Sequence, residues 1–137
     1  MKNINIIIES LKEKQVKVTP QRVAVIEYLE KNPVHPTADD IFRAVSKKFP
    51  AISLATVYNT LEKLEEINEV YKLQFTKESS VNYEYNLEPH LHFYCSECSK
   101  IYDIWEGLPC LNINEIDGHQ IVSKRCYFIG MCKNCIK

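Results

Sequence analysis

Two pairs of cysteines constrain this chain more than any other feature. Cys95 and Cys98 form one Cys-x-x-Cys pair, and Cys132 and Cys135 form a second. Each pair follows an apolar stretch with the pattern of a short strand, where such turns usually occur. Four thiolates at about 2.3 Å from a cation make a closed tetrahedral zinc site. The sequence therefore predicts one structural Zn²⁺ ion, which contributes folding free energy to a small domain.

The other cysteines and the overall composition indicate a folded, unsecreted chain. Hydrophobic residues make up 45% of the sequence, and the apolar run near Ile6 is too short to span a bilayer and lacks a cleavage site. We therefore expect a cytoplasmic protein with no membrane partner, in which cysteines serve metal or redox chemistry. Redox-active or unrelated thiols are the alternative to zinc. Cys126, on a strand pattern, is expected to be a small buried residue, and Cys110 to be exposed.

Residues 1–85 have the pattern of a winged helix-turn-helix domain. A first helix is predicted over residues 4–14, and a second starts with Thr19 as N-cap and Pro20 at its first position. A third follows Pro36 and ends at Pro50, and Ser53 is the expected N-cap of a fourth. The residues expected to be buried in the last three helices are Val25, Ile26, Leu29, Ile41, Phe42, Val45, Phe49, Leu54, Val57, Leu61 and Leu64. A hairpin over 70–75 and 81–85 supplies the wing.

Residues 86–137 are expected to form a small α/β dimerisation domain, which makes the chain an α+β protein. Short strands are predicted over 91–95, 100–105 and 125–130, with a helical segment around 108–115. The two domains meet near residues 86–89. The four-cysteine site belongs to the second domain.

A second group of metal-ligating residue types surrounds this boundary. His90 and His92 leave the same face of a strand, and the turn at the first cysteine pair should place His92 opposite Asp103. Glu84 ends the wing strand, and His35 precedes the third helix. Three imidazoles and two carboxylates suit Fe²⁺, Mn²⁺ or Zn²⁺. Taken singly, His35 is as readily a loop residue and Glu84 a solvent-facing one, but together they favour a regulatory metal site.

These residues resemble the ferric uptake regulator family over nearly the whole chain. The stretches that carry the resemblance are Thr19-Pro20-Gln21-Arg22, His35-Pro36-Thr37-Ala38-Asp39-Asp40, Ser53-Leu54-Ala55-Thr56-Val57-Tyr58-Asn59, His90-Leu91-His92 and both cysteine pairs. The resemblance implies a homodimeric repressor that binds an inverted-repeat operator on double-stranded DNA when its regulatory metal is bound. By position, it implies that His35, Glu84, His90, His92 and Asp103 hold that metal.

The resemblance also bears on what is sensed. Asp103 and Asn59 resemble the peroxide-responsive branch, in which Fe²⁺-catalysed oxidation adds oxygen to His35 or His90 and releases the metal; Glu84 departs from that branch. A further metal site of some iron regulators is not expected, because Leu91 and Lys124 occupy its positions. The alternative within the family is an iron- or zinc-uptake regulator that senses metal level.

A metal that joins the two domains would set the spacing of two recognition helices and so control operator binding. In the fourth helix, we expect Tyr58 to contact a thymine methyl and Asn59 a base edge, with phosphate contacts from Ser53, Thr56, Lys14, Lys17 and Arg22. Two other classes remain open. A metalloenzyme could use the same histidines and carboxylates, but no substrate pocket is evident. A zinc-ribbon interaction module would leave His35 and Tyr58 unexplained.

Overall fold

The computed structural model describes residues 3–32, 35–85, 88, 90–106, 112–122 and 124–136. The chain divides into two compact units. Unit 1 comprises Met1–Gln74 and Ser80–Leu87, and unit 2 comprises Phe75–Ser79 and Glu88–Lys137. Within the described residues, no helix has the length and apolar character needed to cross a membrane.

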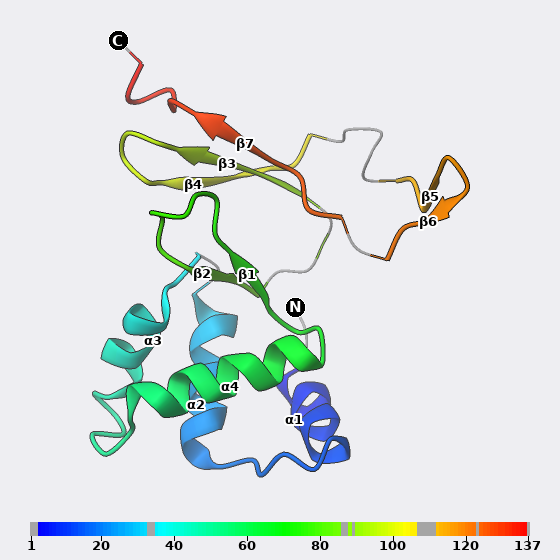
Figure 1. Cartoon of the computed structure of the whole chain (residues 1–137). Helices are drawn as coiled ribbons and strands as arrows, with labels where there is room; N and C mark the ends of the chain where they lie inside the picture. The colour runs from blue at the N-terminus through cyan, green and yellow to red at the C-terminus, as the bar shows by residue number, and fades with distance from the viewer. Residues whose placement is uncertain are drawn as a thin grey trace. The chain divides into compact units, whose positions relative to one another are not determined.

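Four capped helices form the body of unit 1 (Figure 1). They are α1 (Ile4–Glu13), α2 (Pro20–Lys31), α3 (Ala38–Val45) and α4 (Leu54–Glu66). The expected caps are present, since the side chains of Thr19, Thr37 and Ser53 each accept a bond from a backbone N–H in the first turn of α2, α3 and α4. Such bonds satisfy donors that a helix leaves without an internal partner. The start of each helix is therefore encoded locally.

One apolar core holds the four helices of unit 1 together. The expected positions of α2 and α4 are buried except Leu54, which is half-buried against the core. Helix α3 is shorter than predicted: it ends at Val45, and a turn follows before Phe49 packs on the core, its backbone N–H still bonded to the Val45 carbonyl at 2.9 Å. Its apolar periodicity continues because Phe49 reaches the same core from the turn.

A two-stranded antiparallel hairpin completes unit 1. Strand β1 (Tyr71–Leu73) pairs with β2 (Asn82–Glu84), with Tyr71 opposite Glu84. The β2 backbone is fastened to the segment before α3, because the Tyr83 N–H donates to the Pro36 carbonyl at 2.9 Å. Four helices followed by such a hairpin match the winged-helix pattern expected from the sequence.

Unit 2 is built on a three-stranded sheet in the order β4-β3-β7. Strand β3 (Leu91–Cys95) runs antiparallel to β4 (Ile101–Ile104) and parallel to β7 (Tyr127–Gly130). The predicted pairing of His92 with Asp103 is confirmed by the β3–β4 register. Phe75 belongs to this unit, where its ring stacks on that of Tyr94 with centroids 5.2 Å apart.

One predicted element of unit 2 is wrong where it can be compared. Most of the helical segment expected around residues 108–115 lies outside the described residues, but Glu115 is in a strand. Strands β5 (Glu115–Ile116) and β6 (His119–Gln120) form a hairpin. Asp117 and Gly118 make its turn with φ values of 51° and 82°, which glycine adopts without a steric cost. The Asp-Gly pair was the local signal for this turn.

Candidate metal centres and nucleic-acid interface

The four paired cysteines come together at one end of the unit 2 sheet. Cys95 ends β3, and the second pair follows β7, the parallel neighbour of β3. Their four Sγ atoms lie within 4.8 Å of one another, with 3.8 Å between Cys95 and Cys135 and 3.8 Å between Cys98 and Cys132. A tetrahedron with metal–sulfur bonds of about 2.3 Å has edges of about 3.8 Å. The spacing therefore fits one tetrahedral cation.

The surroundings of these sulfurs favour the thiolate form that a metal needs. The backbone N–H groups of Cys98 and Cys132 point at the Cys95 sulfur, at 3.5 and 3.3 Å. These bonds, that from Cys98 first, lower the pKa of Cys95. The pKa of Cys132 is lowered to about 6, chiefly by the Tyr102 hydroxyl. None of the five described cysteines is in a disulfide.

A ring of thiolates cannot ionise fully without a cation. The hydrogen bond to the Cys132 sulfur is the largest of the effects that raise the pKa of Cys135 to about 12, while that of Cys132 falls. A dication removes this opposition because it attracts all four thiolates at once. The residues present therefore fit a structural zinc ion.

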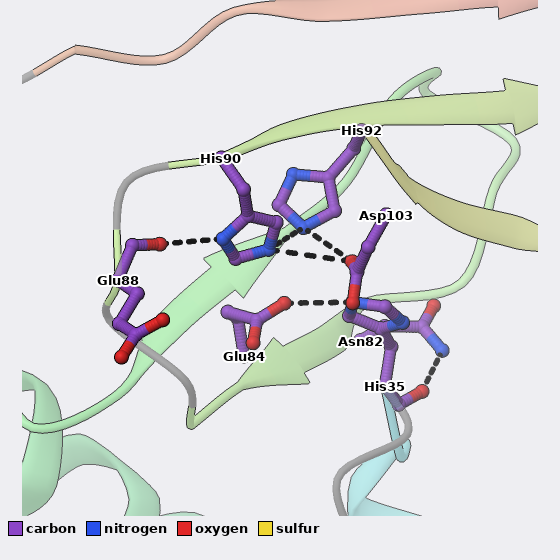
Figure 2. A network of polar contacts seen from close by, with 7 residues as sticks. All are labelled: His35, Asn82, Glu84, Glu88, His90, His92 and Asp103. Carbon is purple, nitrogen blue, oxygen red and sulfur yellow. Dashed lines mark hydrogen bonds and ion pairs between the residues drawn. The ribbon is translucent and has the colours of Figure 1, made fainter. Parts of the chain in front are cut away.

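His90, His92 and Asp103 converge within unit 2. The two imidazole Nε2 atoms lie 3.1 Å apart, and the Asp103 Oδ1 atom lies 3.3 Å from Nε2 of His90 and 3.4 Å from that of His92 (Figure 2). The His90 Nδ1 atom is 2.5 Å from the backbone carbonyl oxygen of Glu88. A ring whose Nδ1–H donates to a carbonyl keeps Nε2 unprotonated for a metal. Two imidazoles and one carboxylate are thus arranged as ligands.

Unit 1 brings together the other two predicted ligands. The Nε2 atom of His35 lies 2.7 Å from the Glu84 Oε2 atom, and the Asn82 side-chain amide donates to the His35 carbonyl at 2.6 Å (Figure 2). His35 comes from the segment before α3 and Glu84 from β2, so these bonds between distant parts of the chain place one imidazole beside one carboxylate. The pair offers a nitrogen and an oxygen donor to a first-row divalent cation.

The first turns of α4 present polar and aromatic side chains to solvent. Tyr58 is 47% exposed, which argues against a packed core aromatic, and Asn59 is exposed beside it. Asn59 accepts a hydrogen bond from Arg22 at 2.6 Å. Ser53 is the N-cap, and its hydroxyl lies 2.9 Å from that of Thr56. Lys14 and Lys17 are exposed in the segment that precedes α2. All the residues expected at DNA are therefore on unit 1.

Sequence reasoning missed the residues that support these sites. Asn82 and Glu88 hold ligands through backbone contacts, Trp105 stacks on the His90 ring, and Arg22 bonds Asn59. No spacing rule marks such partners, because each belongs to a different element from the residue it contacts or acts through its backbone. The expectation for Cys126 is wrong: it is exposed, because it lies just before β7 rather than within the sheet. Cys110 lies outside the described residues.

Comparison with known proteins places this geometry in context. The model of the ferric uptake regulator family matches residues 13–123. The chain is 38% identical over 133 residues to the peroxide operon regulator of Bacillus subtilis (strain 168), covering 95% of this chain and 91% of the relative.

Two solved structures are similar as well. The ferric uptake regulator Fur of Helicobacter pylori has a TM-score of 0.79 at 23% identity, with 98% of this chain and 91% of that one covered, and it indicates the same fold. PerR from Streptococcus pyogenes, whose structure was described as a basis for peroxide sensing and gene regulation, has a TM-score of 0.55 at 31% identity. That likeness covers 94% of this chain and 90% of PerR.

Proposed function

Because the chain belongs to the ferric uptake regulator family, we propose that it is a metal-dependent transcriptional repressor that binds DNA as a homodimer and responds to peroxide. In this proposal residues 1–85 bind DNA, and residues 86–137 form the dimer and hold metal. The convergence of His90, His92 and Asp103 on one point carries the proposal. Such a site serves regulation rather than catalysis, as in the relatives that the chain resembles.

Two metals have separate roles in this proposal. Cys95, Cys98, Cys132 and Cys135 hold a structural Zn²⁺ ion, supported by sulfur spacings that match a tetrahedron. The regulatory ion, Fe²⁺ or Mn²⁺, takes His90, His92 and Asp103 from unit 2 and His35 and Glu84 from unit 1. Zn²⁺ suits the same nitrogen and oxygen donors and is the third candidate. Each set of donors is preformed within its own unit.

Sharing of the regulatory ion between the units makes DNA binding depend on metal. A homodimer that meets an inverted repeat must place two recognition helices at one spacing. Ligands contributed by both units restrict the hinge between them, so the metal-bound chain populates the arrangement that engages both half-sites. Without the metal, the second half-site is lost and affinity falls.

The face of β7 supports the homodimer. β7 lies at one edge of the described sheet, and Tyr127, Phe128, Ile129 and Met131 are each 44–48% exposed. Exposed apolar side chains in sequence along an edge strand are a common site of association. A second copy of the chain is the partner expected to cover this face.

Helix α4 is the proposed recognition helix. Its N-terminal turns would enter the major groove, with the Tyr58 ring against a thymine methyl and Asn59 at a base edge. Ser53, Thr56, Lys14 and Lys17 are proposed to contact phosphates, which sets position and contributes salt-dependent affinity.

The response to peroxide depends on which ion is bound. Fe²⁺, when bound, supplies the electrons that reduce peroxide. The imidazoles of His35 and His90 are then the side chains that take up oxygen, because they are ligands of the same ion. An oxidised ring is a weaker ligand, so the chain releases the metal and the operator. A carboxylate as short as Asp103 holds the ion close to β4, which distinguishes this site from one with glutamate.

The experiment that tests the proposal is operator binding by Fe²⁺-loaded and Mn²⁺-loaded protein before and after a peroxide pulse. We expect metal-dependent binding in both forms and loss after peroxide in the Fe²⁺ form alone. If the Fe²⁺ form keeps its operator after peroxide but loses it when metal is withdrawn, the chain is a metal-uptake regulator, the second candidate. No metal-dependent DNA binding in any form would contradict both.

A further inference from the structure

We propose that Arg22 is a positioning residue for base recognition, which holds the Asn59 side-chain amide with its NH2 group directed to DNA. The inference rests on the proposed DNA-binding function and adds a specificity-determining residue to it. The sequence alone suggested a phosphate contact for Arg22. The contacts of its guanidinium point to another role.

Both terminal nitrogens of the Arg22 guanidinium are used inside unit 1. Its Nη1 atom donates to the Lys17 carbonyl at 2.8 Å, and its Nη2 atom donates to the Asn59 Oδ1 atom at 2.6 Å. Arg22 lies in the first turn of α2, Lys17 in the segment before α2, and Asn59 in α4. The planar group therefore links the recognition helix to two other places on the same unit.

These contacts distinguish Arg22 from an ordinary phosphate ligand. An arginine that binds phosphate usually directs two parallel N–H groups at its oxygens. In Arg22 the two terminal nitrogens bond a backbone carbonyl and an amide oxygen instead. Using them for phosphate would break contacts that already satisfy them.

The chemistry of the pair determines which way the Asn59 amide faces. A guanidinium has donors only, whereas an amide has an oxygen acceptor at one branch and an NH2 donor at the other. Rotation of the amide by half a turn would bring its NH2 against a donor and lose the bond of 2.6 Å. Asn59 therefore keeps its oxygen toward Arg22 and its two N–H groups away from it.

An amide held in this way favours one kind of base edge. The two N–H groups of Asn59 match acceptors on the major-groove edge, which are purine N7, guanine O6 and thymine O4. An amide free to rotate would present oxygen or nitrogen alike and would discriminate less. Arg22 thus contributes to specificity although it need not touch a base.

The test measures the ratio of affinities for an operator and for a scrambled duplex of the same length. The operator is the duplex that Mn²⁺-loaded wild-type chain recovers from a random-sequence DNA library. The variants are Arg22→Ala, Asn59→Ala and the double variant. Arg43→Ala is the matched control, because Arg43 is an exposed arginine of unit 1 that pairs with Asp40 on α3.

We expect each single variant to lower the ratio about fivefold for each half-site, and so about 25-fold over two half-sites. The double variant should lose no more than Asn59→Ala alone, because Arg22 acts through Asn59. Arg43→Ala should keep the wild-type ratio. Arg22→Lys keeps the charge but cannot bridge both acceptors, so it should lose specificity and keep binding to scrambled DNA.

Three outcomes overturn the inference. One is an equal loss on operator and scrambled DNA with a shallower salt dependence, which would make Arg22 a phosphate contact. The second is additive losses in the double variant. The third is full specificity in Arg22→Lys, which decides the matter even if Arg22→Ala unfolds. If the wild-type chain recovers no preferred duplex, the proposed function itself fails, which is a distinct result.

Discussion

The indole ring of Trp105 stacks on the imidazole of His90, with centroids 4.5 Å apart and 22° between the ring planes. Trp105 is the one tryptophan of the chain, and it is half-exposed just after β4. His90 is a proposed ligand of the regulatory ion. The intrinsic tryptophan fluorescence of the protein therefore reports on the surroundings of this ligand.

We expect Mn²⁺ or Fe²⁺ to quench Trp105 fluorescence as the regulatory site fills, since a paramagnetic ion at His90 lies next to the stacked ring. A titration monitored at the tryptophan emission maximum measures the affinity. Trp105→Phe should abolish the signal and keep metal-dependent DNA binding. Fluorescence that stays constant while operator binding switches on would place the metal away from His90.

The second prediction concerns the structural zinc. Cys132→Ser should reduce bound zinc from about one ion per chain to near zero and lower the thermal stability of the second unit, because metal binding contributes folding free energy. Elemental analysis and thermal unfolding measure the two effects. Cys126→Ser is the matched control, since Cys126 is an exposed cysteine outside the cluster. Zinc retained in full by Cys132→Ser would contradict the four-cysteine assignment.

The third prediction concerns His35. His35→Ala should abolish metal-dependent operator binding and leave bound zinc and the thermal unfolding of the chain unchanged, because it removes the one imidazole that unit 1 contributes. Affinity for the operator is measured with and without Mn²⁺. His119→Ala, in the β5–β6 hairpin, is the control histidine and should behave as wild type. Operator binding by His35→Ala that still responds to metal would reduce His35 to a loop residue.

The fourth prediction concerns Tyr58. Tyr58→Ala should weaken operator binding by roughly 1–3 kcal/mol and leave binding to random DNA unchanged, because the ring contacts a base rather than phosphate. Tyr58→Phe keeps the ring and should retain most of the specific affinity. Fluorescence anisotropy on labelled duplexes measures both. An equal loss on random DNA would assign the tyrosine to the DNA backbone.

The fifth prediction concerns peroxide. A small excess of peroxide added to the Fe²⁺-loaded chain should add oxygen to peptides that contain His35 or His90, and the Mn²⁺-loaded chain should stay unmodified. Asp103→Glu should lower the yield sharply, because a longer carboxylate changes where the ion is held. Peptide mass spectrometry maps the sites. Unmodified histidines in an Fe²⁺ form that keeps its operator would favour metal sensing instead.

Local signals in the sequence were enough for the elements and for one pairing across the sheet. Helix starts at Thr19, Thr37 and Ser53 follow from side chains that cap the next turn, and such bonds depend on residues three apart. The pairing of His92 with Asp103 follows from the position of one tight turn. The four cysteines identify themselves because few other arrangements explain two such pairs.

Other features depend on how distant segments pack, and no local pattern encodes them. The segment that includes Glu115 adopts a strand because the Asp117-Gly118 turn lets it pair with β6. Cys126 is exposed because the strand starts one residue after it.

The sequence by itself determined the helices of the first unit, the cysteine site and the register that pairs His92 with Asp103, because each depends on residues close along the chain. Only the tertiary structure decided that Arg22 meets Asn59 and that Asn82 holds the His35 backbone. Contacts between residues far apart in the chain form where packed elements bring them together. Their positions are therefore set by the core of each unit.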